Sequence, residues 1–260
     1  MDNPIGVVSC HLSCSSIQAA CEKARAIGLD AIEWFEGDQE FISDPAVADE
    51  VAVFSSKYGI TNSYHAPFMD SWDIGRMNRP GTRKTFEAAI TCCDRMNARL
   101  ITFHPGTFQP GGSRSAALEA IIGGLEDSLK LAAKLGVRIS LENLTRCYSE
   151  TALGDRVEDF DFIFERVGSE WVGLNLDVGH AKITNNFSEL LASHGKRLIN
   201  THLNDTDGTT DGHLPPGEGT VDFPGFLGKV QALGYRGPFN LEFPEASGAY
   251  KSFIATLRSF

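Results

Sequence analysis

The feature that most constrains the fold is a regular alternation of short β-rich runs with helix-length amphipathic stretches. The runs predicted to be strands are 5–10, 29–36, 60–67, 99–106, 137–144, 172–180, 198–205 and 238–243. Helical patterns fill the intervals, and Gly28 and Gly136 each follow one of them where a left-handed C-cap is expected. Strands that alternate with helices in this way predict parallel βα units.

Two architectures are built from βα units, an open doubly wound sheet and a closed (β/α)8 barrel. A doubly wound sheet normally shows a glycine-rich phosphate turn after an early strand, and the sequence contains no GxGxxG or P-loop motif. Eight units in 260 residues match the usual size of the barrel. No linker divides the chain. We therefore expect residues 1–260 to form a single TIM-barrel domain of the α/β class.

The composition argues against some classes of binding partner and some cellular locations. The formal net charge of −11 provides no basic footprint for nucleic acid, although a local cleft or bound cations can offset it. No apolar run is long enough to cross a membrane, and no signal peptide is recognisable. The six cysteines show no CxxC spacing, which favours reduced thiols. We expect a cytoplasmic protein, and homo-oligomer formation stays open.

Ionisable residues concentrate where the predicted strands end. From the third strand to the eighth they are His65, His104, Glu142, Asp177 with His180, His202 and Glu242. Because all strands of such a barrel open on one mouth, these side chains are expected to converge there. Burying so many groups without a partner would cost several kcal/mol for each ion, and a divalent cation would remove that cost. Mixed imidazole and carboxylate donors suit Zn²⁺, Mn²⁺, Co²⁺ or Fe²⁺ better than Ca²⁺.

The loop after the seventh strand adds two candidate ligands. Asp211 and His213 are spaced i, i+2, so an extended segment points both the same way, toward one ion shared with His180. In the same loop, Asp205 and Asp207 are expected to be solvated turn residues.

Several other residues are weaker candidates for the mouth. Glu33 and Glu36 of the second strand alternate with apolar residues and lie on opposite faces of it, and Glu36 is expected either to reach the rim or to be exposed to solvent. His11 follows the first strand and is a candidate for lining the pocket. His194 is expected on the surface of a helix. Phe68, Met69 and Trp72 follow the third strand and are expected to pack together or to form an apolar wall.

The ordered motifs GLDAIEWF, HAPF, FHPG, LEN, DVGH, HLND and LEF resemble those of the xylose isomerase-like TIM-barrel superfamily. The resemblance spans nearly the whole chain. This superfamily contains sugar isomerases and epimerases, and also the endonuclease IV class of apurinic/apyrimidinic (AP) endonucleases, AP endonuclease family 2.

The resemblance to the epimerase-like members implies one divalent metal, Mn, Zn, Co or Mg, bound by Glu142, Asp177, His202 and Glu242. Glu142 and Glu242 would be the catalytic residues that move a proton beside the carbonyl of a carbohydrate, through a metal-stabilised enediolate. His180, His104 and His65 would contact the substrate. We expect this activity, a metal-dependent sugar or sugar-derivative isomerase or epimerase.

The resemblance to the endonuclease IV-like members implies an alternative, a phosphodiester hydrolase with up to three zinc ions. The positions that match its zinc ligands are His65, His104, Glu142, Asp177, His180, His202, Asp211, His213 and Glu242. Against it, Gly212 stands where the endonucleases typically place Arg, and LPPGEG is common in the sugar-isomerase-like members. Against the epimerase, the loop after the seventh strand has no Arg to hold a keto-sugar, and His104 stands where isomerases often place Trp. A non-catalytic sugar- or metal-binding barrel and a metal-dependent lyase or dehydratase are further alternatives.

Overall fold

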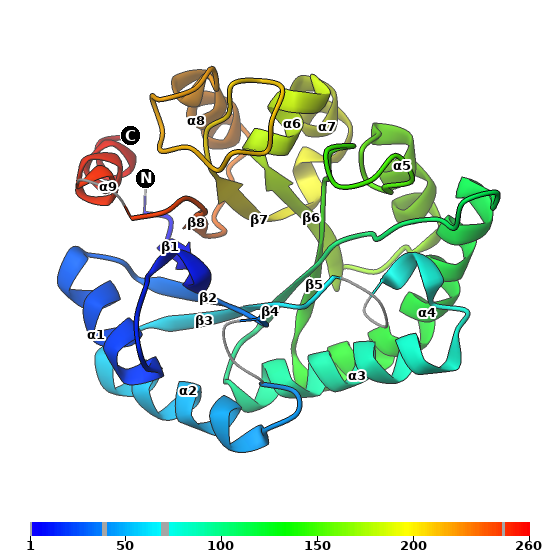
Figure 1. Cartoon of the computed structure of the whole chain (residues 1–260), viewed down its shortest axis with the longest axis horizontal. Helices are drawn as coiled ribbons and strands as arrows, with labels where there is room; N and C mark the ends of the chain where they lie inside the picture. The colour runs from blue at the N-terminus through cyan, green and yellow to red at the C-terminus, as the bar shows by residue number, and fades with distance from the viewer. Residues whose placement is uncertain (1, 38–40, 69–72, 246–247) are drawn as a thin grey trace.

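The computed structural model describes residues 2–37, 41–68, 73–245 and 248–260. Within them, eight parallel strands close a barrel in chain order, and the helices form a ring outside it (Figure 1). β1 closes the barrel because Gly6 is paired with Ala31 of β2 on one side and with Asn240 of β8 on the other. The predicted (β/α)8 architecture is confirmed.

The strands are β1 (Ile5–Val8), β2 (Ala31–Phe35), β3 (Thr61–His65), β4 (Leu100–Phe103), β5 (Arg138–Glu142), β6 (Val172–Asp177), β7 (Leu198–Leu203) and β8 (Phe239–Leu241). The α-helices are α1 (Ile17–Ile27), α2 (Pro45–Tyr58), α3 (Pro80–Arg95), α4 (Arg114–Leu135), α5 (Val157–Arg166), α6 (Val178–Thr184), α7 (Phe187–His194), α8 (Phe223–Ala232) and α9 (Ala249–Ser259). Short 3-10 helices are η1 (Ser9–His11), η3 (Ile74–Arg76) and η4 (Gly195–Arg197).

Local signals set the ends of several helices. The side chains of Ser16 and Ser113 accept hydrogen bonds from backbone N–H groups in the first turns of α1 and α4. Gly28 and Gly136 end these two helices with φ of 89° and 68°, as predicted, because glycine adopts the left-handed conformation without strain. The chain turns back at these two glycines and enters β2 and β5 a few residues later.

Every predicted run contains a strand, but each strand is shorter than predicted. The largest change of type is in 172–180, where β6 ends at Asp177 and a helix begins at Val178. The carboxylate of Asp177 accepts a hydrogen bond from the His180 N–H at 2.6 Å and so caps α6. A Cβ on Gly179 would lie 1.8 Å from Asn204 Oδ1, so only glycine fits this close approach. His180 therefore reaches the mouth from a helix and not from a strand.

The interior of the barrel contains a buried polar layer below the mouth. Its side chains are Glu33, Ser63, Thr102, Ser140, Asn200 and Asn240, from strands β2, β3, β4, β5, β7 and β8. Asn200 Nδ2 donates to Thr102 Oγ1 at 3.1 Å, and Asn240 Nδ2 donates to Asn200 Oδ1 at 3.0 Å. Branched apolar side chains usually fill this space in TIM barrels. Here the apolar core lies mainly between the strands and the helices.

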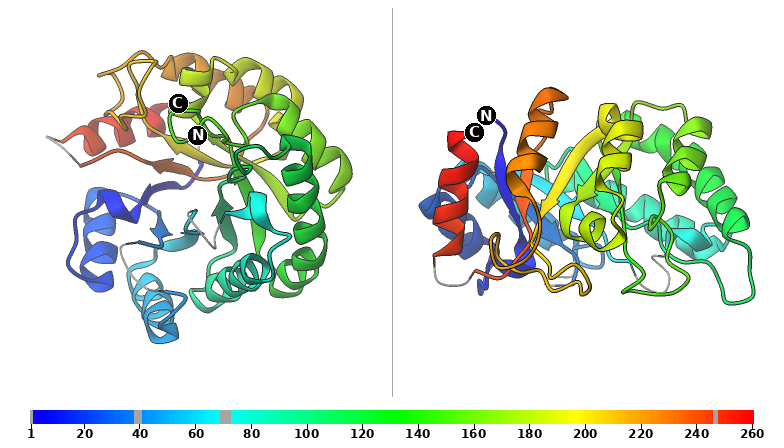
Figure 2. Two further views of the ribbon diagram at one scale, coloured as in Figure 1. Left: turned by 45° about the vertical axis from the view of Figure 1, so that its right-hand side comes forward. Right: turned by 90° about the horizontal axis from the view of Figure 1, so that it is seen from above.

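The chain ends lie side by side next to β1 and α9, as two views of the ribbon agree (Figures 1 and 2). Among the described residues, no helix has the length and apolar composition that crossing a bilayer requires.

The expectation that His194 lies on the surface of a helix is wrong. His194 ends α7 with its side chain buried, its Nε2 2.9 Å from Asp161 Oδ1 and its ring centroid 5.2 Å from that of Phe164. The apolar face of α7 turns toward α5, and His194 falls on that face.

Candidate metal centre

Six consecutive strands place an ionisable side chain at the same mouth of the barrel. His65, Glu142 and Asp177 are the last residues of their strands, His202 lies within β7, and His104 and Glu242 directly follow β4 and β8. None of these six residues is more than 7% exposed. The six residues that the sequence predicted at the mouth of the barrel are therefore together there, and they are buried.

Four of these residues, Glu142, Asp177, His202 and Glu242, form what we call the inner group. Each offers one ligand atom, and these atoms lie within 4.8 Å of one another. His202 Nδ1 is 3.3 Å from Glu142 Oε1 and 3.2 Å from Glu242 Oε2. Carboxylates and an imidazole at such separations can share one divalent cation.

Two histidines lie on one side of the inner group. His65 Nε2 and His104 Nε2 are 3.4 Å and 3.5 Å from the same oxygen, Glu142 Oε2. The three residues form a second set of converging ligand atoms, which we call the side group. Glu142 therefore belongs to both groups.

A third set, which we call the outer group, consists of His180, Asp211 and His213. Asp211 Oδ2 is 3.4 Å from His180 Nε2, and Asp211 Oδ1 is 3.3 Å from His213 Nε2. The predicted meeting of these residues is observed, but not on an extended segment, because His213 has a left-handed φ of 43°. The His11 ring lies 5.6 Å from the His213 ring, so His11 does line this part of the mouth.

Backbone carbonyl groups fix the orientation of three of these imidazole rings. The Nδ1 atoms of His65, His180 and His213 lie 2.9, 2.8 and 2.7 Å from the carbonyl oxygens of Ala66, Asn143 and Glu242. Each ring therefore donates Nδ1–H to the backbone and leaves Nε2 toward the neighbouring carboxylate. His202 is reversed, with Nδ1 toward the inner group.

The inner group is electrostatically strained when no cation is bound. Burial raises the pKa of Asp177 to about 7, and the charges of Glu242 and Glu142 add to this rise. Burial also disfavours charge on Glu142, but His202 and His104 outweigh it and hold the pKa of Glu142 well below its usual range. Burial disfavours a charged His202, yet Glu242 and Glu142 outweigh it and raise its pKa. Asp177 and His202 thus hold protons that a bound cation would displace.

Two buried atoms of the outer group, His180 Nε2 and Asp211 Oδ1, form no hydrogen bond, although each faces an ionisable atom of the group at 3.4 Å and 3.3 Å. Leaving such atoms unpaired costs about 1–3 kcal/mol each. Both atoms belong to residues whose ligand atoms converge, and both can bind a metal. The donor chemistry and these unpartnered atoms fit a divalent cation.

The expectation that Asp205 is a solvated turn residue is wrong. Asp205 is buried, and its carboxylate accepts four backbone N–H groups, from Thr206, Gly217, Gly219 and Val221, at 2.8–3.0 Å. It holds together the loop that carries Asp211 and His213. Asp207 is exposed, as expected, and accepts from the backbone N–H groups of Thr209 and Thr210.

Aromatic side chains border the side group. The Phe68 ring stacks on His104 with a centroid distance of 4.4 Å, and Tyr148 stands edge-on to His104 at 5.8 Å and to His180 at 5.6 Å. Met69 and Trp72 lie outside the described residues. Tyr148 has no counterpart among the sequence predictions, because it lies several residues past the end of its strand.

Glu33 is the most important site residue that the sequence patterns missed, because they favour Glu36 of the same predicted strand, whose carboxylate accepts a hydrogen bond from the Tyr64 hydroxyl. It is fully buried, and its Oε1 lies 2.9 Å from His202 Nε2. A carboxylate in the middle of a strand, flanked by apolar residues, was the available signal. One sequence does not distinguish an inward carboxylate from an outward one before the barrel is closed.

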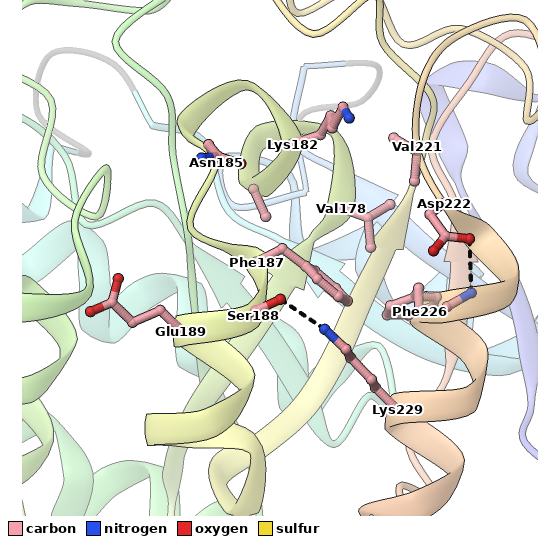
Figure 3. Close-up of a pocket in the computed structure, with 12 residues that line it drawn as sticks. Val178, Lys182, Asn185, Phe187, Ser188, Glu189, Val221, Asp222, Phe226 and Lys229 are labelled. Carbon is pink, nitrogen blue, oxygen red and sulfur yellow. Dashed lines mark hydrogen bonds between the residues drawn. The ribbon is translucent and has the colours of Figure 1, made fainter.

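A separate hollow of about 360 Å³ lies between α6, α7 and α8, where Lys229 borders the rings of Phe187 and Phe226 and Lys182 lies at the other end, near Val221 (Figure 3). Lys229 Nζ donates to Ser188 Oγ at 2.8 Å. Val178 and Ala181 of α6 line this hollow, whereas His180 of the same helix faces the mouth. Helix α6 therefore separates the hollow from the candidate metal centre.

A family model described as the xylose isomerase-like TIM barrel matches residues 21–260. This protein belongs to that family, as the strand-end motifs predicted.

Individual relatives are similar over nearly the full chain. An uncharacterised protein of Methanocaldococcus jannaschii, MJ1311, is 28% identical over 260 residues, which cover 97% of this chain and 87% of the relative. The crystal structure of a D-tagatose 3-epimerase-like protein superposes with a TM-score of 0.84 at 26% identity, covering 98% of this chain and 97% of the other. The fold is also that of the 3-keto-D-glucoside 4-epimerase YcjR from E. coli, with a TM-score of 0.81, 18% identity and 100% of both chains covered.

Proposed function

We propose that the protein is a divalent-metal-dependent isomerase or epimerase that acts on a sugar or sugar derivative. The observation that carries the proposal is the meeting of two buried carboxylates, Glu142 and Glu242, which both lie close to His202 Nδ1. The similarity to a D-tagatose 3-epimerase-like protein at 26% identity supports a carbohydrate substrate.

In this proposal the inner group holds the cation through Glu142, Asp177, His202 and Glu242. When bound there, a divalent cation would polarise the substrate carbonyl and so acidify the neighbouring C–H. Mn²⁺, Co²⁺, Zn²⁺ and Mg²⁺ all remain candidates for this role.

The two glutamates move the proton. One carboxylate accepts the proton from the carbon beside the carbonyl, and the C–H electron pair passes into the enediolate of the substrate. The other glutamate, as the acid, returns a proton to carbon, and the roles exchange in the reverse reaction. Against the effect of burial, His202 and His104 hold the pKa of Glu142 below its usual range, and His202 and His213 do the same for Glu242. Both carboxylates are thus ionised at neutral pH, and either can accept a proton. The glutamate that returns the proton therefore has to take one up from solvent first.

Neighbouring amides orient both glutamates. Asn175 Nδ2 donates to Glu142 Oε2 at 3.1 Å, and Asn204 Nδ2 donates to Glu242 Oε2 at 3.3 Å. In the same proposal, His65, His104 and His180 contact the sugar hydroxyls from the rim. Phe68 and Tyr148 form an aromatic border on that side of the mouth.

The test is a panel of ketoses and keto-sugars incubated with the metal-loaded protein in D₂O. Epimerisation with deuterium incorporated at the carbon beside the carbonyl is the expected result. Glu142→Gln should abolish it, while Glu126→Gln, at an exposed position on α4, should not. A sugar that binds without any deuterium exchange would instead indicate a non-catalytic binding barrel.

A second candidate function is phosphodiester hydrolysis, and the convergence of all nine predicted ligands into three groups favours it. A hydrolase of this kind should purify with about three zinc ions per chain and nick duplex DNA at an abasic site. The net charge of −11 and Gly212 argue against DNA. One tightly held cation without nicking would exclude this function.

A further inference from the structure

Glu33 of β2 lies directly beneath the inner group and is 0% exposed. Its Oε2 accepts hydrogen bonds from Asn240 Nδ2 at 2.7 Å, Asn200 Nδ2 at 2.9 Å and Ser63 Oγ at 3.2 Å. Its Oε1 lies 2.9 Å from His202 Nε2. Both carboxylate oxygens are therefore engaged, and side chains from three other strands, β3, β7 and β8, contact this one side chain.

The contacts of Glu33 determine what His202 can do. A carboxylate only accepts hydrogen bonds, so the His202 nitrogen that faces Glu33 must carry a proton. That nitrogen is Nε2, which leaves Nδ1 toward Glu142 and Glu242.

We propose that Glu33 is a positioning residue that fixes the tautomer and ring orientation of His202, so that Nδ1 is the metal-binding atom of the inner group. The inference rests on the metal site of the proposed function. Glu33 would belong to that site without binding the metal itself. Such an outer carboxylate orients a ligating histidine and raises its basicity.

The alternative is that Glu33 itself binds a cation, because one of its ligand atoms lies within 4.8 Å of those of His65 and His202. The hydrogen bonds argue against it. Three donors already converge on Oε2, and a cation at Oε1 would have to displace the His202 contact. Breaking the bonds at Oε2 would take one buried hydrogen bond from each of the Asn200 and Asn240 amides.

Glu33→Gln tests the inference with a side chain of the same shape. The three donors at Oε2 require an acceptor, so the Gln carbonyl should face them and its NH₂ should face His202 Nε2. Nε2 must then accept, and the ring proton moves to Nδ1, the atom that faces the inner group. We expect the Kd for Mn²⁺ or Zn²⁺, measured by calorimetry on the purified chain, to rise about 10–100-fold.

Ser63→Ala is the matched control, because it removes one donor from Oε2 and leaves the contact between Glu33 and His202. Its Kd should stay close to that of the wild-type chain. If Glu33→Gln binds metal as tightly as the wild type, or if Ser63→Ala weakens binding equally, the inference is wrong and the metal site stands. If the wild-type chain binds no divalent cation, the proposed function itself fails.

A second measurement does not depend on a variant folding. In the zinc-loaded wild-type chain, ¹⁵N NMR should detect the His202 proton on Nε2 and zinc on Nδ1. Zinc on Nε2 would overturn the inference and favour direct ligation near Glu33.

Discussion

The inner and outer groups contain the same kinds of side chain but are built on different parts of the fold. The inner group stands at the ends of β5, β6 and β8 and within β7, and all its members are buried. In the outer group, Asp211 and His213 lie on the loop after β7, and their side chains are 14% and 23% exposed. The strands hold the inner group through the whole barrel, whereas the loop holds the outer group through its own hydrogen bonds.

The two groups also differ in what supports their histidines. His180 and His213 donate Nδ1–H to backbone carbonyls, so their orientation does not depend on the identity of an acceptor side chain. His202 depends on a side chain, Glu33. The inner group is thus more rigid but more sensitive to single substitutions, and the predictions below follow from this difference.

The largest effect is expected at Glu242 of the inner group. Glu242→Gln keeps the shape of the side chain but removes a base, so kcat for epimerisation should fall by about 10²–10⁴-fold. Glu245→Gln is the control, because Glu245 lies three residues further and pairs with Lys23. A kcat of the variant equal to that of the wild type would exclude proton transfer by Glu242.

Acidic pH should weaken metal binding at the inner group. In the metal-free chain burial raises the pKa of Asp177 to about 7, so Asp177 is ionised above that pH and protonated below it. Below pH 7 the metal must displace one more proton than it does above pH 7. The Kd for the metal should therefore rise about tenfold more for each pH unit below pH 7 than it does above it. Calorimetric titrations between pH 5 and 8 measure this slope.

Asp211→Asn in the outer group is the comparison for the pH titration. Burial opposes its charge, but His180 and His213 outweigh it and lower the pKa of Asp211. Asp211 therefore stays ionised across the tested range. A plot of log Kd against pH for the variant should still change slope near pH 7, as it does for the wild type. If this change in slope disappears in Asp211→Asn, the group that titrates near pH 7 belongs to the outer group.

Asp205 should link the stability of the loop to the outer group. Asp205→Asn turns an amide toward two of the four backbone N–H groups, which should lower the free energy of unfolding by about 2–3 kcal/mol. For a chain of this size that is a fall in Tm of about 5–10 °C. Asp207→Asn, on the exposed side of the same loop, should leave Tm close to that of the wild type, as differential scanning fluorimetry would detect.

The smallest effect is expected at His213. For an isomerase, His213→Asn should leave kcat in the same order of magnitude and one cation bound per chain, because the inner group is intact. Elemental analysis and the epimerase assay test both statements. Loss of all activity together with loss of metal would favour the hydrolase instead.

Sequence patterns were sufficient for the fold and for the rim of the mouth. Alternating strands and helices predicted the barrel, and a closed parallel barrel must bring all strand ends to one mouth. The residues at strand ends, such as His65 and Glu142, could therefore be placed together without knowing any contact.

Only the tertiary structure decided which residues lie behind that rim. Glu33 and Asp205 look like ordinary polar residues in the sequence, and burial with hydrogen bonds from distant strands or loop positions gives them their roles. The same holds for the choice between Nδ1 and Nε2 of His202, which depends on a contact between residues 169 positions apart. Periodicity reports the direction of a side chain along one strand, but the partner that fixes its protonation comes from another strand, and only barrel closure brings the two together.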